Sequence, residues 1–427
     1  MKNGQWRNGI LGLLVFWTTV LLWPAAAGAQ DDLTQLQAEL EAQKQKQAEL
    51  QDRINQLEAR QRLKEKALNE KIDEVSARAT EERAAEIPDV LKWASKLRWS
   101  GDFRYRYEYI DQRERDVRHR NRIRARLGLD AEVNEEWNLG FRLATGDSDP
   151  VSTNQTLDDW SSKKDVWLDK AFLGYHPNWI EGLNVLAGKI GNPWYKPAKN
   201  ELIWDGDLTP EGAAFLYGVP LGDQTAVNVV GGGFWVEERS SDADTSLWGI
   251  QAYVKHQLAE PTHVLAGASW YDYGNIETES DFDGFFGNTS VGGVYAGDYD
   301  LFEVFGEFGT EIGGMPILFF GDYVQNTAVA DEDTGWLIGA QINKAKNPGS
   351  WQFEVDYRNL ERDAVVGQFT SSDFLGGGTG GEGYRFAFGY ALAKNVAANL
   401  TYYMNEFDER NSDVDYDRLM ADIVLKF

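Results

Sequence analysis

The sequence predicts an all-β transmembrane barrel of about 16 antiparallel strands, preceded by an α-helical coiled coil. Three features of the chain support this prediction. The C-terminal residues alternate in character, with Leu419, Ile423 and Leu425 on one face of a strand, and the chain stops on Phe427. Similar strands recur from about residue 97 onward. The chain also opens with a secretory signal.

The first 29 residues have the three parts of a signal peptide. Lys2 and Arg7 give a basic start, residues 10–23 form an apolar stretch, and residues 27–29 are small enough for cleavage. The apolar stretch is shorter than the roughly 20 residues that a spanning helix needs. An uncleaved membrane anchor is the alternative interpretation. No later segment is apolar enough for a membrane helix, so a chain that enters the membrane does so as a closed barrel.

Composition excludes several classes of function. The chain has no cysteine, which rules out a disulfide framework and thiol chemistry. The formal net charge of −26 argues against nucleic acid as a partner, because phosphate backbones require a basic surface. The 18 Tyr and 16 Trp residues suit the aromatic girdles that flank the lipid-facing band of a barrel.

Residues 30–87 are predicted to be a separate periplasmic coiled coil. Residues 31–83 contain no Gly or Pro, and a heptad repeat runs from Leu33 to Val75. Several core positions of the repeat are polar, which usually trades stability for a defined register and oligomeric state. A solvated single helix or a disordered linker is the alternative. Pro88 ends this segment, and residues 88–427 form the predicted barrel.

We expect sixteen strands, with 14 and 18 as the neighbouring even counts. Short and long gaps alternate between them, as in outer-membrane barrels with short periplasmic turns and long extracellular loops. An even count places both ends of the barrel in the periplasm, next to the coiled coil. The expected strands are 97–109, 118–131, 136–145, 166–175, 183–190, 211–219, 224–237, 246–257, 262–273, 298–309, 315–325, 334–344, 350–360, 383–393, 395–406 and 415–427.

The sharpest candidate site is a ladder of arginines on the first strands. Four arginines share one face of the second strand, opposite apolar residues. Because an arginine facing lipid near the midplane costs about 2–4 kcal/mol, these side chains are expected to face the lumen. Ion pairing with carboxylates as ordinary barrel packing is the alternative. The expected basic pore-lining residues are Arg104, Arg106, Arg120, Arg122, Arg124, Arg126, Arg142 and Lys189, with Lys170 as an addition.

The third long gap, residues 191–210, is too apolar for an ordinary exposed loop. We expect it to fold into the barrel and narrow the pore. Its acids would face the arginines and create a transverse field that orients polar solutes. An extracellular loop packed at a subunit contact is the alternative. The expected constriction residues are Trp194, Tyr195, Glu201, Trp204, Asp205 and Asp207.

Four stretches of the chain, residues 101–106, 120–128, 140–146 and 202–212, resemble the "putative porin" family of Gram-negative outer membranes. The resemblance covers most of the chain after the coiled coil. It implies a trimeric general porin with an inward-folded third loop. It also implies that Phe427 is the C-terminal signal read by the barrel-assembly machinery. The coiled coil resembles those of some phosphate-type porins.

We therefore expect a porin for passive diffusion of small hydrophilic solutes and ions in the Gram-negative outer membrane. The four histidines are scattered and the acidic loops lack a calcium signature, so no catalysis, metal or cofactor is expected. The expected partners are outer-membrane lipids and lipopolysaccharide, the barrel-assembly machinery, further copies in a homotrimer, and peptidoglycan through the coiled coil.

Two rival functions remain open at this stage. One is a structural tether between the outer membrane and the cell wall, with little conduction. The other is an anion-selective specific channel, suggested by the arginines. Outside residues 1–83 the chain has 55 acids against 30 bases, which argues against strong anion selectivity.

Overall fold

The structure is a computed structural model that describes residues 71, 89–278, 280, 284–409 and 412–427. The predicted signal peptide and, apart from Lys71, the predicted coiled coil lie outside the described residues. The chain divides into two compact units, Met1–Asp89 and Val90–Phe427. The second unit contains the barrel and is described here.

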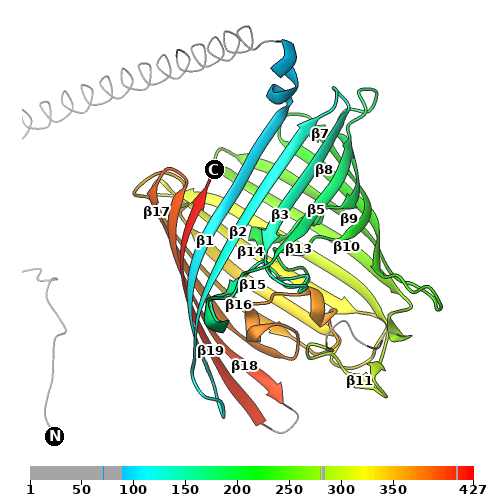
Figure 1. Cartoon of the computed structure of the whole chain (residues 1–427), viewed down its shortest axis with the longest axis vertical. Coiled ribbons are helices and arrows are strands. Elements are labelled where there is room, and N and C mark those ends of the chain that lie inside the picture. Colours follow the sequence, from blue (N-terminus) through cyan, green and yellow to red (C-terminus); the bar gives the residue numbers. More distant parts are fainter. Residues whose placement is uncertain (1–70, 72–88, 279, 281–283, 410–411) are drawn as a thin grey trace, which may run out of the picture. The chain divides into compact units, whose positions relative to one another are not determined.

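Sixteen long strands of this unit form one closed antiparallel sheet (Figure 1), which confirms the predicted strand count. Each strand pairs with the next one along the chain, and β1 pairs with β19 to close the barrel. The strands of the wall are β1 (Leu97–Gln112), β2 (Arg118–Glu132), β3 (Trp137–Thr145), β5 (Val166–Tyr175), β6 (Leu183–Lys189), β7 (Glu211–Leu221), β8 (Thr225–Glu237), β9 (Thr245–Ala259), β10 (Thr262–Gly274), β13 (Tyr299–Ile312), β14 (Met315–Asn326), β15 (Thr334–Ile342), β16 (Trp351–Leu360), β17 (Gly381–Ala393), β18 (Val396–Glu409) and β19 (Ser412–Lys426).

Short elements lie between the strands of the wall. The two-residue strand β4 pairs with β2, and β11 and β12 form a separate small hairpin. None of the helical segments among the described residues is long and apolar enough to cross a membrane. The short elements are β4 (Gln155–Thr156), β11 (Ser290–Val291), β12 (Val294–Tyr295), and the 3-10 segments η1 (Asp89–Lys96), η2 (Asp159–Ser161), η3 (Pro197–Lys199), η4 (Ile276–Thr278), η5 (Gly367–Phe369) and η6 (Phe374–Gly376).

The two ends of the barrel carry connections of different length. At one end, the start of β1 meets the end of β19, where the Gly101 amide donates to the Phe427 carbonyl oxygen at 3.1 Å. Tight turns such as 260–261 and 313–314 lie at this end. The long connections gather at the opposite end (Figure 1), and four of them span residues 146–165, 190–210, 275–298 and 361–380.

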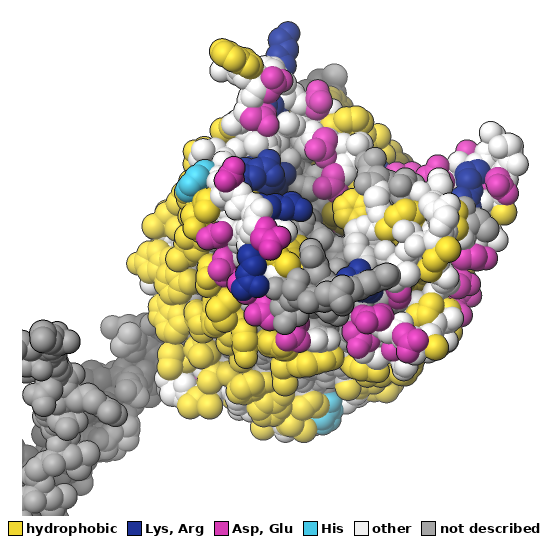
Figure 2. Space-filling view, turned by 90° about the horizontal axis from the view of Figure 1, so that it is seen from below, with side chains coloured by type: hydrophobic (Ala, Val, Ile, Leu, Met, Phe, Trp, Pro, Cys, Tyr) yellow, Lys and Arg dark blue, Asp and Glu magenta, His cyan; other side chains and the backbone are white. Residues whose placement is uncertain are grey.

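The strands have an apolar outer face and a polar inner face. On β1, Phe103 and Tyr105 are 42% and 43% exposed, whereas Arg106, the residue after Tyr105, is only 4% exposed. Hydrophobic side chains cover the side wall, and charged side chains gather at the end with the long loops (Figure 2). This arrangement follows from the period of two in a strand, because a charged side chain on the lipid face is costly.

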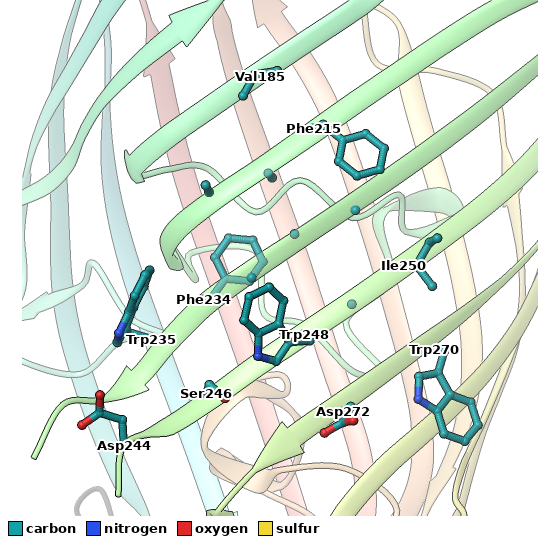
Figure 3. A pocket seen from close by; sticks show the side chains of 16 residues that line it. Val185, Phe215, Phe234, Trp235, Asp244, Ser246, Trp248, Ile250, Trp270 and Asp272 are labelled. Atoms are coloured by element: carbon teal, nitrogen blue, oxygen red, sulfur yellow. The ribbon is translucent and has the colours of Figure 1, made fainter.

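The outer wall carries an apolar groove of about 860 Å³ on β6 to β10 (Figure 3). Its floor is formed by glycines of β8, and the rings of Phe215 and Trp248 lie over Gly231 and Gly233. A Cβ atom on Gly233 would lie 2.5 Å from the Trp248 ring. The groove faces outward and is therefore separate from the interior described below.

The interior of the barrel holds a packed apolar core. Long loops bring buried side chains against the inner wall, including Trp204 of 190–210, Tyr295 of 275–298 and Val365 of 361–380. They pack with wall residues such as Tyr271 and Leu301. Apolar loop segments are buried here because their transfer out of water is favourable. The loops therefore fill part of the lumen.

Candidate channel constriction

The arginines predicted on the first two strands face one another. In the register of β1 and β2, Arg104 lies opposite Arg124, and Arg106 lies opposite Arg122. Like charges in directly opposed positions destabilise a sheet, so this arrangement requires carboxylates nearby. The structure supplies them from β1, from β19 and from two of the inward loops.

Two arginines nearer the short-turn end form a compensated group. Arg124 and Arg126 of β2 both bind Asp102 of β1, at 2.9 and 2.7 Å. Arg126 also binds Asp207 of the 190–210 loop at 3.0 Å, and Arg124 lies 3.8 Å from it. Two guanidinium groups thus meet two carboxylates.

Nearer the long loops, Glu108 of β1 lies at the centre of a second group. Its carboxylate is 2.6 Å from Arg120 and 2.9 Å from Arg418 of β19, and 3.7 Å from both Arg106 and Arg122. Glu108 is fully buried. One carboxylate therefore has four guanidinium groups within 4 Å.

Two more carboxylates complete this second group. Asp422 of β19 binds Arg106 at 2.7 Å, and Asp373 of the 361–380 loop lies 2.9 Å from Arg418 and 3.3 Å from Arg106. Burial raises the pKa of Asp373, but Arg418 and Arg106 outweigh this effect and hold it well below its usual value. The Asp373 carboxylate is therefore ionised.

Arg104 and Arg122 are held mainly by neutral groups. Arg104 donates to the Asn154 side chain, and Arg122 donates to the Asn154 carbonyl oxygen at 3.2 Å. With Arg106, Arg120 and Arg418, they make five guanidinium groups. The ion pairs described above join four of these five, all but Arg104, to three carboxylates, namely Glu108, Asp373 and Asp422. We call these eight residues the upper arginine cluster, where upper means toward the long-loop end, which is drawn at the bottom of Figure 1.

The remaining predicted basic residues divide between the two faces of the wall. Arg142 pairs with Asp169 of β5, and Lys170 lies opposite Arg142 in the register. Lys189 differs from the expectation, because it binds Glu211 at 2.8 Å on the face shared by the outward Phe215. Lys189 lies on the same face of β6 as Leu183, Val185 and Ala187, so the period of two in this strand already indicated an outward position.

The predicted constriction loop lies inside the barrel along the wall from β8 to β14. Trp194 packs edge-on against Tyr271, with ring centroids 5.1 Å apart, and Tyr195 stacks on Phe305 at 5.8 Å. Trp204 also packs against Tyr271, at 5.1 Å. Aromatic contacts of this geometry add about 0.5–1.5 kcal/mol each to the burial of the rings.

Polar contacts fix the same loop on both sides of the lumen. Asn200 donates to Asp322 of β14 at 2.9 Å, and Arg358 of β16 donates to the Glu201 carbonyl oxygen at 3.0 Å. On the other side Asp207 reaches Arg126 of β2. The loop therefore crosses the lumen from β14 and β16 to β2.

The three predicted loop acids have different surroundings. Asp207 contacts the arginines directly, whereas Glu201 accepts hydrogen bonds from the Gly206 amide and the Ser371 hydroxyl. Asp205 is buried, and its carboxylate accepts hydrogen bonds from the backbone amides of Asp207 and Ser372. Burial, together with the Glu201 and Asp207 charges, raises the pKa of Asp205 well above its usual value. The structure thus brings only Asp207 of these three into contact with β2.

Sequence reasoning missed the inward loop of residues 361–380 and four residues of the upper arginine cluster, namely Glu108, Asp373, Arg418 and Asp422. The loop carries buried apolar stretches at 364–366 and 374–375, which were a signal comparable to the tryptophans of 190–210. Arg418 lies on the inner face of a strand whose alternation was recognised. Asp373 had no signal, because only folding brings it to Arg418.

Phe427 ends the chain at the seam between β1 and β19. Its backbone is hydrogen-bonded to Gly101 in both directions, and its side chain is 68% exposed. The ring lies 2.5 Å from the position that a Gly101 Cβ would occupy. Its place on the outer face suits a signal read from outside the barrel.

A closed sixteen-stranded barrel with an apolar outer band and inward loops defines a channel of the porin class. The sequence profile of the family described as "Putative porin" matches residues 111–306 and 298–427. The chain belongs to this family, as its motifs predicted, and it is an outer-membrane channel protein. Proteins of this family are typically channels rather than enzymes.

Several solved porin structures match the chain at low sequence identity. The high-pH structure of Pseudomonas putida OprB matches with a TM-score of 0.53 and 10% identity, covering 78% of this chain and 95% of that chain. The structure of Salmonella typhi OmpF in complex with daunomycin matches with a TM-score of 0.49 and 12% identity, covering 78% of this chain and 97% of that chain. A mutant of the Rh. blastica porin matches with a TM-score of 0.48 and 11% identity, covering 78% of this chain and 100% of that chain. The likeness to OprB supports the barrel fold. No curated protein matches the chain.

Proposed function

We propose that this protein is a porin for passive diffusion of small hydrophilic solutes and ions, with its narrowest part between β2 and the inward loops. The observation that carries this proposal is the contact between Asp207 of the 190–210 loop and Arg126 of β2. It brings opposite charges together inside a barrel whose outer face is apolar. Solutes passing there would meet guanidinium groups on one wall and loop dipoles beside them.

The upper arginine cluster favours a second candidate, an anion-selective channel. The cluster contains five guanidinium groups and three carboxylates, whereas the chain as a whole has a net charge of −26. Selectivity depends on charges at the narrowest part, since distant charges are screened over about 10 Å at 0.1 M salt. The local excess of arginine therefore matters more than the total charge.

Other parts of the proposal concern assembly. We propose a homotrimer in the outer membrane, with residues 30–87 as a coiled coil in the periplasm that contacts peptidoglycan. Phe427 would be the signal for the barrel-assembly machinery, and lipids and lipopolysaccharide would cover the outer band. Residues 1–29 would be removed as a signal peptide. A trimeric stalk would match the three-fold symmetry of the barrels.

The test is the reversal potential across a planar bilayer in a salt gradient. The double variant Arg122→Ala plus Arg124→Ala should shift selectivity toward cations relative to the wild type, by several millivolts at low salt. The shift should shrink as salt rises, because the screening length falls from about 30 Å at 0.01 M to about 3 Å at 1 M. Lys189→Gln is the control, since this cation lies on the outer face of the wall.

Two results would contradict the proposal. A wild-type barrel without any single-channel conductance would favour the structural tether. An unchanged reversal potential at low salt, with conductance and folding intact, would show that these arginines serve only to pack the barrel.

A further inference from the structure

The part of β2 toward the long loops has an edge that β3 does not reach. Strand β3 pairs with β2 only between Arg126 and Glu132, and the two-residue strand β4 takes its place beside Arg122 and Ile123. An open strand edge presents unpaired backbone groups, which proteins usually cover. The pairing of β4 brings residues 151–154, directly before it, against β2. We call these four residues the inner segment.

All four residues of the inner segment are buried, although they belong to a long loop. Val151 packs into the apolar core of the barrel, and the Thr145 hydroxyl at the end of β3 donates to the Thr153 carbonyl oxygen at 3.1 Å. The Thr153 hydroxyl donates to Asp207 of the 190–210 loop at 2.9 Å. The inner segment therefore joins the wall to the predicted constriction loop.

Asn154, the last residue of the inner segment, contacts the two arginines that lack a close carboxylate. Arg104 donates to the Asn154 side-chain oxygen, and Arg122 donates to the Asn154 carbonyl oxygen at 3.2 Å. No ion pair among the described residues includes Arg104, and the carboxylate nearest to Arg122 is 3.7 Å away. One neutral, buried residue thus orients guanidinium groups from β1 and β2 and cancels neither charge.

We propose that Asn154 positions Arg104 and Arg122 in the channel and that its lack of charge determines the ionic selectivity. The upper arginine cluster has five guanidinium groups and three carboxylates, so a carboxylate at position 154 would remove half of an excess of two charges. Salt screens a partly buried charge less than an exposed one, so this difference acts on passing ions. The inference rests on the proposed channel function.

The main variant is Asn154→Asp, because its side chain has almost the same shape and accepts the same hydrogen bond from Arg104. The ratio of chloride to potassium permeability, from the reversal potential in a potassium chloride gradient, should fall at least about twofold in dilute salt. The pore size, measured by exclusion of neutral polyethylene glycols, should stay the same. Ser241→Asp adds the same charge to the exposed loop between β8 and β9 and should leave the ratio unchanged.

Asn154→Leu tests the positioning without adding a charge. It removes the acceptor for Arg104, and Asp422 lies diagonally across the β1–β19 ladder from Arg104. Diagonal neighbours in a sheet are within reach of long side chains. Arg104 should therefore turn to Asp422, and the ratio of chloride to potassium permeability should fall in this variant as well.

The outcomes separate this inference from the channel function. A conducting channel in which either variant of Asn154 keeps the wild-type permeability ratio would overturn the assignment and leave the channel function standing. An equal fall in Ser241→Asp would overturn it too, because total charge and not position 154 would then determine the selectivity. A wild-type barrel without conductance would overturn the channel function itself.

Discussion

The four arginines of β2 from Arg120 to Arg126 have different sets of partners, although they look alike in the sequence. Arg126 and Arg124 are balanced by Asp102 and Asp207, whereas Arg122 has its nearest carboxylate 3.7 Å away. Because these arginines occupy every second position, they all lie on one face of the strand. Their electrostatic roles depend on carboxylates from elsewhere in the chain. Asp207 is the residue whose titration should reveal this.

Asp207 should hold the 190–210 loop to β2 only in its ionised form. Burial raises its pKa, but Arg124 and Arg126 outweigh that effect, so the pKa lies below the usual 3.8. For a carboxyl group lowered in this way, the stabilising contribution is complete above pH 3.8 and is lost as pH falls through the lowered value. Single-channel conductance should therefore become larger or noisier in strong acid.

At pH 7, Asp207→Asn should show the larger or noisier single-channel conductance that the wild type shows in strong acid. It should weaken the loop contact by about 1.5–3 kcal/mol, the range for hydrogen bonds to charged groups. Asp242→Asn, at an exposed position of the loop between β8 and β9, is the control and should behave like the wild type. Identical conductance of wild type and Asp207→Asn at pH 7 would show that the other contacts of the loop hold it without the Asp207 carboxylate.

Among the elements, the inward loops depend on close backbone contacts with one another. Gly378 has a φ of +98°, and a Cβ atom on it would lie 2.8 Å from the carbonyl carbon of Phe286. Backbone cannot give way as a flexible side chain can. The 275–298 and 361–380 loops are thus held in contact where a glycine permits it.

Gly378→Ala should loosen the 361–380 loop, because it adds a clash with backbone to a strained φ that itself costs about 1–3 kcal/mol. Gly292→Ala is a matched control, since Gly292 has a φ of +67° but nothing within 4 Å of its Cβ position. Hydrogen exchange of the amides of 361–380 should rise several-fold in the first variant and stay unchanged in the second. Equal exchange in both variants would contradict this account of the packing.

For the whole molecule, the orientation in the membrane follows from the two kinds of connection. The chain has no cysteine, so single cysteines report cleanly. Asp242→Cys and Asp331→Cys, both in long-loop positions, should react with an impermeant thiol reagent on intact cells. Asp223→Cys and Lys394→Cys, in short turns, should react only after the outer membrane is opened. The reverse labelling pattern would mean an inverted barrel.

The N-terminal heptad repeat predicts a contribution to the assembly of copies. Deleting residues 31–83 should leave the barrel folded, because Val90–Phe427 forms its own compact unit. The temperature at which the oligomer dissociates in detergent should fall, because the interhelical contacts of the repeat are lost. An unchanged dissociation temperature, measured by gel mobility after heating, would show that the segment does not stabilise the oligomer.

The sequence by itself determined the barrel, because a strand in a membrane wall must alternate at a period of two. The polarity of a residue alone indicates the face of the strand on which it lies, as for Phe103 and Arg104 or for Ile423 and Asp422. The strand count followed from the number of alternating segments. Family membership followed from local motifs such as residues 202–212.

Tertiary structure alone decided which charges meet. Arg106 pairs with Asp422, 316 positions away, and Arg418 pairs with Asp373 from a loop whose acid gave no local signal. Local patterns fix the side of a strand on which a residue lies, but they do not specify register or loop docking. These depend on barrel closure and on apolar loop burial, which are properties of the whole chain. The site therefore emerges only when distant segments share one lumen.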